Sequence, residues 1–346
     1  MNFILLQVII SFTFDSKFVH GSTSTPYLTQ THSKLKSRDE ISVSIPYKGV
    51  AVNSTLLKID SEYRKIIEEG FEVLTPENAM KWELTEKVRG VFTFEDADEI
   101  VNYASEHNKR SRGHTIIWQQ QVPSWLPELD PEELIKAIQD HLKALLHHYK
   151  GRLYAIDICN EIIEEDGSFK NTFWYQKLNK TFPRIALKTA RELDPTVKLY
   201  INDYSIEAIN KKSDGLYQLA KELKEQGLLD GIGFQSHFTV GGVPKDMQEN
   251  LERFAALDLD VAITELDIRM KLPSSNEDIN QQAQDYSNVV KICRSIARCV
   301  GITLWGVSYQ NSWIPSFFPG TGAALLYDEN YKPTKAFEAF SSAFMS

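Results

Sequence analysis

Short apolar runs alternate with amphipathic stretches along most of this chain. Residues 153–161 form one such run, rich in β-branched and aromatic residues, which stops at Asn160 and Glu161. A run of this kind is typical of a strand buried on both faces. Residues 259–267 repeat the pattern and run apolar into Glu265. Because a carboxylate inside an apolar core is unfavourable, we expect both strands to deliver their glutamates to the mouth of a pocket.

The alternation predicts eight strands and eight helices. The strands are expected at 48–52, 71–75, 111–118, 153–161, 197–201, 231–237, 259–267 and 301–307. The helices are expected at 55–69, 94–108, 131–150, within 172–193, and at 212–226, 245–256, 280–297 and 333–344. This order favours the α/β class and a single (β/α)₈ TIM barrel, which needs roughly 250 residues. A doubly wound open sheet is the alternative, but the glycine-rich phosphate turn of its nucleotide-binding members is missing from the sequence.

The N-terminus differs from the rest. Residues 3–14 form an apolar run too short to span a bilayer, followed by the small-residue stretch 21–24. We expect a signal peptide at 1–22, a lead-in at 23–45 and the catalytic barrel at 46–346. No Lys or Arg precedes the run, so a buried N-terminal helix is the alternative. The expectation is a secreted, extracellular protein without a membrane partner.

Composition fits this picture. Hydrophobic residues make up 42% and charged residues 25% of the 346, as in ordinary globular proteins. The net charge of −9 argues against a nucleic-acid partner, which would require a basic face.

Three cysteines and two tripeptides bear on secretion. Cys293 and Cys299 bracket the end of a predicted helix, and in a secreted protein we expect them to form a disulfide. Cys159 lies inside a predicted buried strand and is interpreted as a small hydrophobic residue. Asn53 and Asn179 begin Asn-x-Thr/Ser tripeptides and are predicted glycosylation sites.

The predicted strand ends carry the chemistry, because the C-terminal strand ends of such a barrel line the active site. They supply carboxylates, amides, imidazoles and indoles, which suit the hydroxyl edges and C–H faces of a sugar. Phosphate-binding glycines and metal-ligand spacings are missing, so no metal or cofactor is expected. The residues are Glu77, Asn78, Lys81, His114, Trp118, Asn160, Glu161, Asn202, Asp203, Tyr204, Gln235, His237, Glu265, Asp267, Trp305 and Trp313.

Glycosidic hydrolysis needs one carboxylic acid to protonate the leaving oxygen and one carboxylate at the anomeric carbon. Glu161 and Glu265 are the candidate pair. Their positions alone do not assign the two roles.

Six motifs in order carry a resemblance. They are 75–82 (TPENAMKW), 112–118 (RGHTIIW), 160–161 (NE), 231–237 (GIGFQSH), 263–267 (ITELD) and 302–306 (ITLWG). From about residue 45 to 340 the chain resembles the endo-1,4-β-xylanases of glycoside hydrolase family 10. The cysteine pair before Gly301 is similar to the disulfide of fungal members.

The resemblance implies a retaining double displacement on xylan and xylo-oligosaccharides. We expect the protein to be a monomer. Glu161 would be the acid/base, protonated at rest, and Glu265 the nucleophile, with their carboxyls about 5–5.5 Å apart. His237 and Asn160 are the expected hydrogen-bonding neighbours of Glu265. Glu77, Asn78 and Lys81 would bind the sugar on the non-reducing side. The remaining substrate-binding candidates, most of them around the cleaved sugar, are His114, Trp118, Tyr204, Gln235, Trp305 and Trp313.

The chain also departs from most family members. They have Trp where it has Ile156, His where it has Gln119 and Asp where it has Tyr309. We expect Ile156 to alter the packing below the site, Gln119 to change the hydrogen-bond network around the nucleophile, and Tyr309 to remove one carboxylate near the eighth strand. The stretch 316–322 reads as an insertion that walls off one side of the cleft.

Two other functions stay open. The same scaffold could act on another β-1,4-glucan. Xylose lacks the hydroxymethyl group of glucose, so selectivity depends on how tightly Trp305, Trp313 and the loop close over the position of that group. A non-catalytic carbohydrate-binding protein on a decayed barrel is the other, and it is disfavoured because both glutamates are present.

Overall fold

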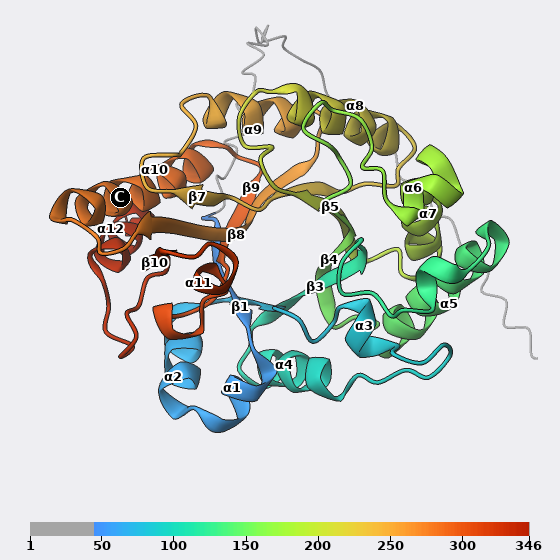
Figure 1. The fold of residues 1–346 in the computed structure, drawn as a ribbon, viewed down its shortest axis with the longest axis horizontal. Helices are drawn as coiled ribbons and strands as arrows, with labels where there is room; N and C mark the ends of the chain where they lie inside the picture. The colour runs from blue at the N-terminus through green and yellow to red at the C-terminus, as the bar shows by residue number, and fades with distance from the viewer. Residues whose placement is uncertain (1–44, 346) are drawn as a thin grey trace, which may run out of the picture. The chain divides into compact units, whose positions relative to one another are not determined.

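The computed structural model describes residues 45–345. Within them, eight parallel strands close into a barrel, since each pairs with its neighbour and β8 and β1 both pair with β9 (Figure 1). The barrel strands are β1 (Tyr47–Val52), β2 (Val73–Pro76), β3 (Arg110–Ile117), β4 (Leu153–Asn160), β5 (Lys198–Asp203), β6 (Gly231–Phe234), β8 (Asp260–Lys271) and β9 (Cys299–Leu304). The predicted (β/α)₈ barrel is confirmed, and an open sheet is excluded.

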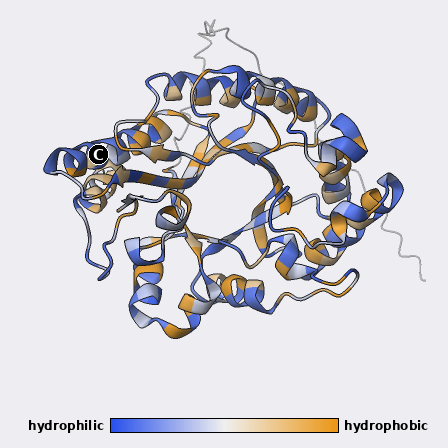
Figure 2. Cartoon of the chain, in the orientation of Figure 1, coloured by the Kyte–Doolittle hydropathy of each residue, from blue (hydrophilic) through white to orange (hydrophobic). Residues whose placement is uncertain are grey.

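Helices surround the ring of strands. The helices of this outer layer are α1 (Ser54–Ile59), α2 (Ser61–Gly70), α4 (Glu95–Glu106), α5 (Pro131–His148), α7 (Phe182–Leu193), α8 (Lys211–Glu225), α9 (Met247–Ala255), α10 (Asn276–Ser295) and α12 (Lys335–Met345). Short elements lie in the loops: α3 (Trp82–Thr85), η1 (Leu126–Glu128), α6 (Phe173–Leu178), η2 (Asn179–Thr181), β7 (His237–Thr239), η3 (Tyr309–Asn311), α11 (Ile314–Phe317) and β10 (Thr321–Gly322). Figure 2 shows hydrophobic residues concentrated on the strands and hydrophilic residues spread over the outer helices.

Two predicted elements are each divided in the structure. The expected helix at 55–69 is two helices, because Asp60 ends α1 and its carboxylate caps α2 by accepting from the backbone N–H groups of Glu62 and Tyr63. The expected strand at 231–237 is β6 followed by β7, because Ser236 between them adopts a left-handed φ of 64°. This break turns the chain toward the barrel opening just before His237.

The strands that carry the two glutamates are buried, as predicted. Seven of the eight residues of β4 are buried, and Glu161 follows its last residue directly. Glu265 lies within β8, which continues well past the predicted end to Lys271 and pairs there with β10. Strand β8 therefore rises above the barrel opening instead of stopping at it.

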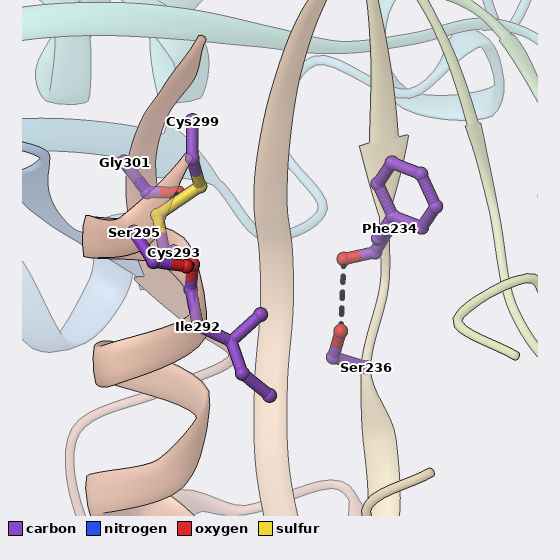
Figure 3. Close-up of a disulfide and its surroundings, with 7 residues drawn as sticks. All are labelled: Phe234, Ser236, Ile292, Cys293, Ser295, Cys299 and Gly301. Carbon is purple, nitrogen blue, oxygen red and sulfur yellow. Dashed lines mark hydrogen bonds between the residues drawn. A yellow bond between two sulfur atoms is a disulfide. The ribbon is translucent and has the colours of Figure 1, made fainter. Parts of the chain in front are cut away.

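The predicted disulfide is confirmed. Cys293, near the end of α10, is bonded to Cys299, the first residue of β9 (Figure 3). Cys159 is buried in β4 as a free thiol. The bond fixes the short connection between α10 and β9, and such links contribute about 2–4 kcal/mol, less for a short loop than for a long one.

The predictions about secretion and glycosylation are not settled by the fold. The expected signal peptide at 1–22 and nearly all of the lead-in at 23–45 lie outside the described residues. In residues 45–345 no helix has the length and apolarity needed to cross a membrane. Asn53 caps α1 and Asn179 is exposed after α6, and their glycosylation stays a prediction.

Candidate active site

A cleft of about 850 Å³ lies at the C-terminal ends of the barrel strands. All thirteen residues predicted to be catalytic or substrate-binding line it: Glu77, Asn78, Lys81, His114, Trp118, Asn160, Glu161, Tyr204, Gln235, His237, Glu265, Trp305 and Trp313. Residues that the prediction did not place there also line it, among them Gln121, Lys170, Glu207 and Arg269. Asn202, Asp203 and Asp267 lie behind this lining, fully buried.

Glu265 is buried and held by two donors. Asn202 Nδ2 donates to its Oε1 at 2.7 Å, and His237 Nε2 donates to its Oε2 at 3.1 Å. Burial would raise the pKa of this carboxyl, but the hydrogen bond from His237, the electrostatic influence of the nearby imidazoles of His114 and His237, and the Asn202 amide outweigh it. The pKa of Glu265 is therefore below its ordinary value of 4.5, and the group is a carboxylate at neutral pH.

His237 is a cation between two carboxylates. Its Nδ1 donates to Asp267 Oδ2 at 3.0 Å, while Nε2 serves Glu265. Burial lowers the pKa of the imidazole, but the charges and hydrogen bonds of Asp267 and Glu265 raise it to about 10. Trp313 Nε1 donates to the same Asp267 oxygen at 2.8 Å, so the indole that lines the cleft is fixed by this group as well.

The raised pKa of His237 makes stability depend on pH. The folded chain keeps this proton up to about pH 10, whereas the ordinary imidazole loses it near 6.5. The stabilisation is therefore complete below pH 6.5 and is lost as the pH rises through about 10, by an amount on the order of 5 kcal/mol. Urea denaturation at pH 6.5, 8 and 9.5 is expected to show falling unfolding free energy in the wild type and a flatter dependence in His237→Gln. Parallel slopes in the two proteins would contradict the assignment.

A chain of amides links the two glutamates. Thr264 Oγ1 donates to Asn202 Oδ1 at 2.5 Å, which turns the Asn202 amide nitrogen toward Glu265 and toward Asn160 Oδ1 at 2.9 Å. Asn160 Nδ2 in turn donates to Glu161 Oε1 at 3.3 Å. The expectation that Asn160 would contact Glu265 is thus wrong. Asn202 makes that contact, and Asn160 serves the other glutamate.

Glu161 has different surroundings. It follows β4 with a left-handed φ of 55°, and its backbone N–H donates to Asn202 O at 2.9 Å. Gln235 Nε2 donates to Oε1 at 3.3 Å, Gln119 Nε2 donates to Oε2 at 3.4 Å, and the Lys170 ammonium lies 3.7 Å from Oε2. Gln119 therefore contacts Glu161, and its expected effect on the network around Glu265 is corrected accordingly.

The wall after β2 forms a separate polar group. Lys81 Nζ donates to Asn78 Oδ1 at 2.8 Å and to Gln121 Oε1 at 2.7 Å, and it lies 4.8 Å from the centre of the Trp118 ring. Burial raises the pKa of Glu77 and lowers that of Lys81. These oriented amides and charges are suited to hydroxyl groups of a sugar.

His114 is both a satisfied buried histidine and a cleft residue. Its Nδ1 contacts Asp157 Oδ2 at 3.0 Å, and Arg112 Nη2 donates to the other oxygen of Asp157 at 2.5 Å. The Trp305 ring meets it edge to face, with centroids 5.2 Å apart. The Asp157 contact leaves Nε2 as the nitrogen that can face a ligand.

The departures from the family pattern have different positions. Ile156 is buried in β4, where it fills the space above Gly113. Tyr309 is outside the cleft lining. The stretch 316–322 does form part of the wall, since Phe317 and Phe318 line the cleft.

The sequence matches Glycosyl hydrolase family 10 over residues 38–343. The chain belongs to this family. Endo-1,4-beta-xylanase A of Phanerodontia chrysosporium is 42% identical over 329 residues, which are 94% of this chain and 78% of that protein. An endo-1,4-beta-xylanase of Agaricus bisporus is 42% identical over 78% of this chain and 81% of its own length. The resemblance predicted from the six motifs is confirmed.

Solved structures agree in fold. A glycosylated family 10 endo-beta-1,4-xylanase of Gloeophyllum trabeum is 39% identical, with a TM-score of 0.85 over 88% of this chain and 98% of that chain. Xylanase 10B of Thermotoga petrophila, in complex with xylobiose, is 36% identical, with a TM-score of 0.85 over 87% of this chain and 94% of its own. Members of this family are glycoside hydrolases, and this chain is one of them.

Proposed function

We propose that this chain is a secreted endo-1,4-β-xylanase that cleaves internal β-1,4-xylosidic bonds of xylan with retention, as a monomer and without a cofactor. The observation that carries the proposal is a pair of glutamates in one cleft with contrasting environments. Glu265 is held ionised by an imidazolium and an amide, whereas Glu161 is contacted by three amides and the Lys170 ammonium. The xylanase relatives support xylan as the substrate.

In the first step, the Glu265 carboxylate attacks the anomeric carbon and Glu161 gives its proton to the departing glycosidic oxygen. The anomeric C–O bond breaks, and a glycosyl ester forms on Glu265. Negative charge leaves Glu265 and develops on Glu161, where the Lys170 ammonium and the three amide donors stabilise it.

In the second step, a water molecule takes the place of the departed sugar chain. Glu161 removes its proton as the water oxygen bonds to the anomeric carbon, and the ester bond to Glu265 breaks. His237 and Asn202 are already oriented to receive the returning carboxylate charge, so no rearrangement is required. Two inversions at the same carbon give net retention.

Secretion is supported by two features. Residues 3–14 carry the apolar run of a signal peptide. The Cys293–Cys299 bond is of a kind that persists outside the reducing cytosol.

The test is product analysis. The protein is incubated with linear xylan and with a soluble cellulose derivative, products are separated by length, and the anomer formed first is read by NMR. Short xylo-oligosaccharides released first as β-anomers, with little product from the glucan, are expected. Comparable cleavage of both polymers would replace xylanase by a broader β-1,4-glycanase, and first-formed α-anomers would overturn retention. Binding without any product would indicate a carbohydrate-binding protein.

A further inference from the structure

One cationic side chain of the cleft is not used by the proposed reaction. Arg269 lies on β8, on the same face as Glu265 and Asp267, because alternate residues of a strand point to one side. Four residues of extended strand place its Cα about 13 Å beyond that of Glu265. Its side chain lines the cleft where β8 rises above the barrel opening.

The guanidinium of Arg269 is held in place without being neutralised. It lies 3.9 Å from the centre of the Phe318 ring, in the stretch 316–322 that reads as an insertion. Phe318 in turn packs against Trp313, with ring centroids 5.6 Å apart. The guanidinium of Arg269 makes one long hydrogen bond, from Nη1 to the Phe238 carbonyl oxygen at 3.5 Å. An aromatic face thus orients the guanidinium and leaves most of its N–H donors unused.

The other cationic and imidazole side chains that line the cleft all have acceptors. His114 and His237 are hydrogen-bonded to aspartate carboxylates, Lys170 lies 3.7 Å from the carboxyl group of Glu161, and Lys81 donates to two amide oxygens. Among residues 45–345, Arg269 has neither a carboxylate nor a side-chain amide as partner. Arg269 is therefore an oriented positive charge that faces the cleft and has no negatively charged partner among the described residues.

A planar guanidinium with free donors matches a carboxylate, which it can bind through two parallel hydrogen bonds. The xylose units of the main chain are neutral, but xylan also carries uronic acid branches. An anionic branch would be repelled by the Glu265 carboxylate, so the cleft can accept it where an unpaired cation lies.

We propose that Arg269, stacked on Phe318, binds the carboxylate of a uronic acid branch, so that acidic, uronic-acid-substituted xylan is a preferred substrate. This inference rests on the proposed xylanase function. It adds a specificity-determining contact about 13 Å along β8 from the reacting carboxylate.

The experiment compares kcat/KM on two oligosaccharides with the same xylan backbone. One carries a single uronic acid branch, and the other is the same molecule after chemical reduction of the carboxyl to an alcohol. Arg269→Gln is expected to lower kcat/KM about tenfold on the acidic substrate and by less than about twofold on the reduced one, as for the loss of a charged hydrogen bond. Arg269→Lys should retain part of the preference. Lys271→Gln is the matched control, because it removes the same charge from an exposed position on the same strand outside the cleft lining.

Equal losses on both substrates, or an equal effect of Lys271→Gln, would overturn the proposal. A second measurement separates this failure from failure of the proposed function. Calorimetric titration of the two oligosaccharides into Glu265→Ala and Glu265→Ala/Arg269→Gln requires no turnover. Tighter binding of the acidic compound that depends on Arg269 supports the contact even if neither oligosaccharide is cleaved, and binding indifferent to the carboxylate rejects it.

Discussion

Glu265→Ala is expected to lower turnover on xylan by a factor on the order of 10⁴–10⁶, the range found when the attacking group of a covalent mechanism is removed. Glu265 is the carboxylate that His237 and Asn202 keep ionised, at 3.1 and 2.7 Å. Without it, no covalent intermediate can form. The barrel should persist, because the imidazolium of His237 keeps its partner Asp267. Steady-state rates on xylan and a thermal unfolding curve measure both parts.

The isosteric variant Glu265→Gln is the control for packing. Its side chain fills the same volume and can still accept a hydrogen bond from Asn202, but it is neutral and a poor nucleophile. If Glu265→Gln loses as much turnover as Glu265→Ala, the loss comes from the missing nucleophile and not from altered packing. A further check uses azide with the alanine variant, because a small anion fits the vacated space and attacks the anomeric carbon from the same side as the lost carboxylate. Turnover near the wild-type value in either variant would reject Glu265 as the nucleophile.

Much of the barrel could be predicted because its signal is local. A strand buried on both faces must be an apolar run, and β4 and β8 are such runs. The divisions inside elements depend instead on single residues. Asp60 ends one helix and caps the next, and Ser236 turns the chain through a left-handed conformation. Neither residue type forces such a break, so hydrophobic periodicity could not locate it.

The candidate site was likewise predictable only in part. Residues at the ends of strands were predictable from their position, because the barrel brings all strand ends to one opening. The contacts among them were not, as the exchange of Asn160 and Asn202 at Glu265 illustrates. Lys170 and Arg269 were not predicted at all. Lys170 comes from a loop, and Arg269 lies on a part of β8 beyond its expected end, so that only the tertiary structure brings them into the cleft.

The two glutamates also differ in a way that the sequence alone left open. Glu265 is fixed by a cation and by an amide whose orientation Thr264 sets, so it is prepared to be an anion before the reaction begins. Glu161 has a carboxylate oxygen near Lys170, so its contacts are favourable for the charge that appears after it has given up a proton. The geometry therefore supports the assignment of roles that the family resemblance implied.

Glu161→Ala is expected to separate substrates by their leaving groups. The leaving group of xylan is a sugar alkoxide, which is poorly stabilised and needs a proton. The kcat/KM on xylan should therefore fall by about 10²–10⁴, the usual contribution of general acid catalysis. A dinitrophenyl xylobioside departs as a stable phenolate, so its kcat/KM, which reports the first step, should fall by less than about tenfold. Its kcat should fall further, because the glycosyl ester on Glu265 then waits for a water molecule that no base activates.

That delay supplies the control. Azide needs no base, so it should raise the kcat of Glu161→Ala on the aryl substrate and yield a β-glycosyl azide, while leaving the wild type unchanged. Glu161→Gln, which keeps the contacts of the side chain but holds no transferable proton, should behave like the alanine variant. Equal losses of kcat/KM on xylan and on the aryl glycoside would show that Glu161 binds or positions the substrate and does not protonate the leaving group. The acid/base role would then have to pass to another cleft carboxyl, and Glu77 and Glu207, whose pKa values are both raised by burial, are the candidates that this site offers.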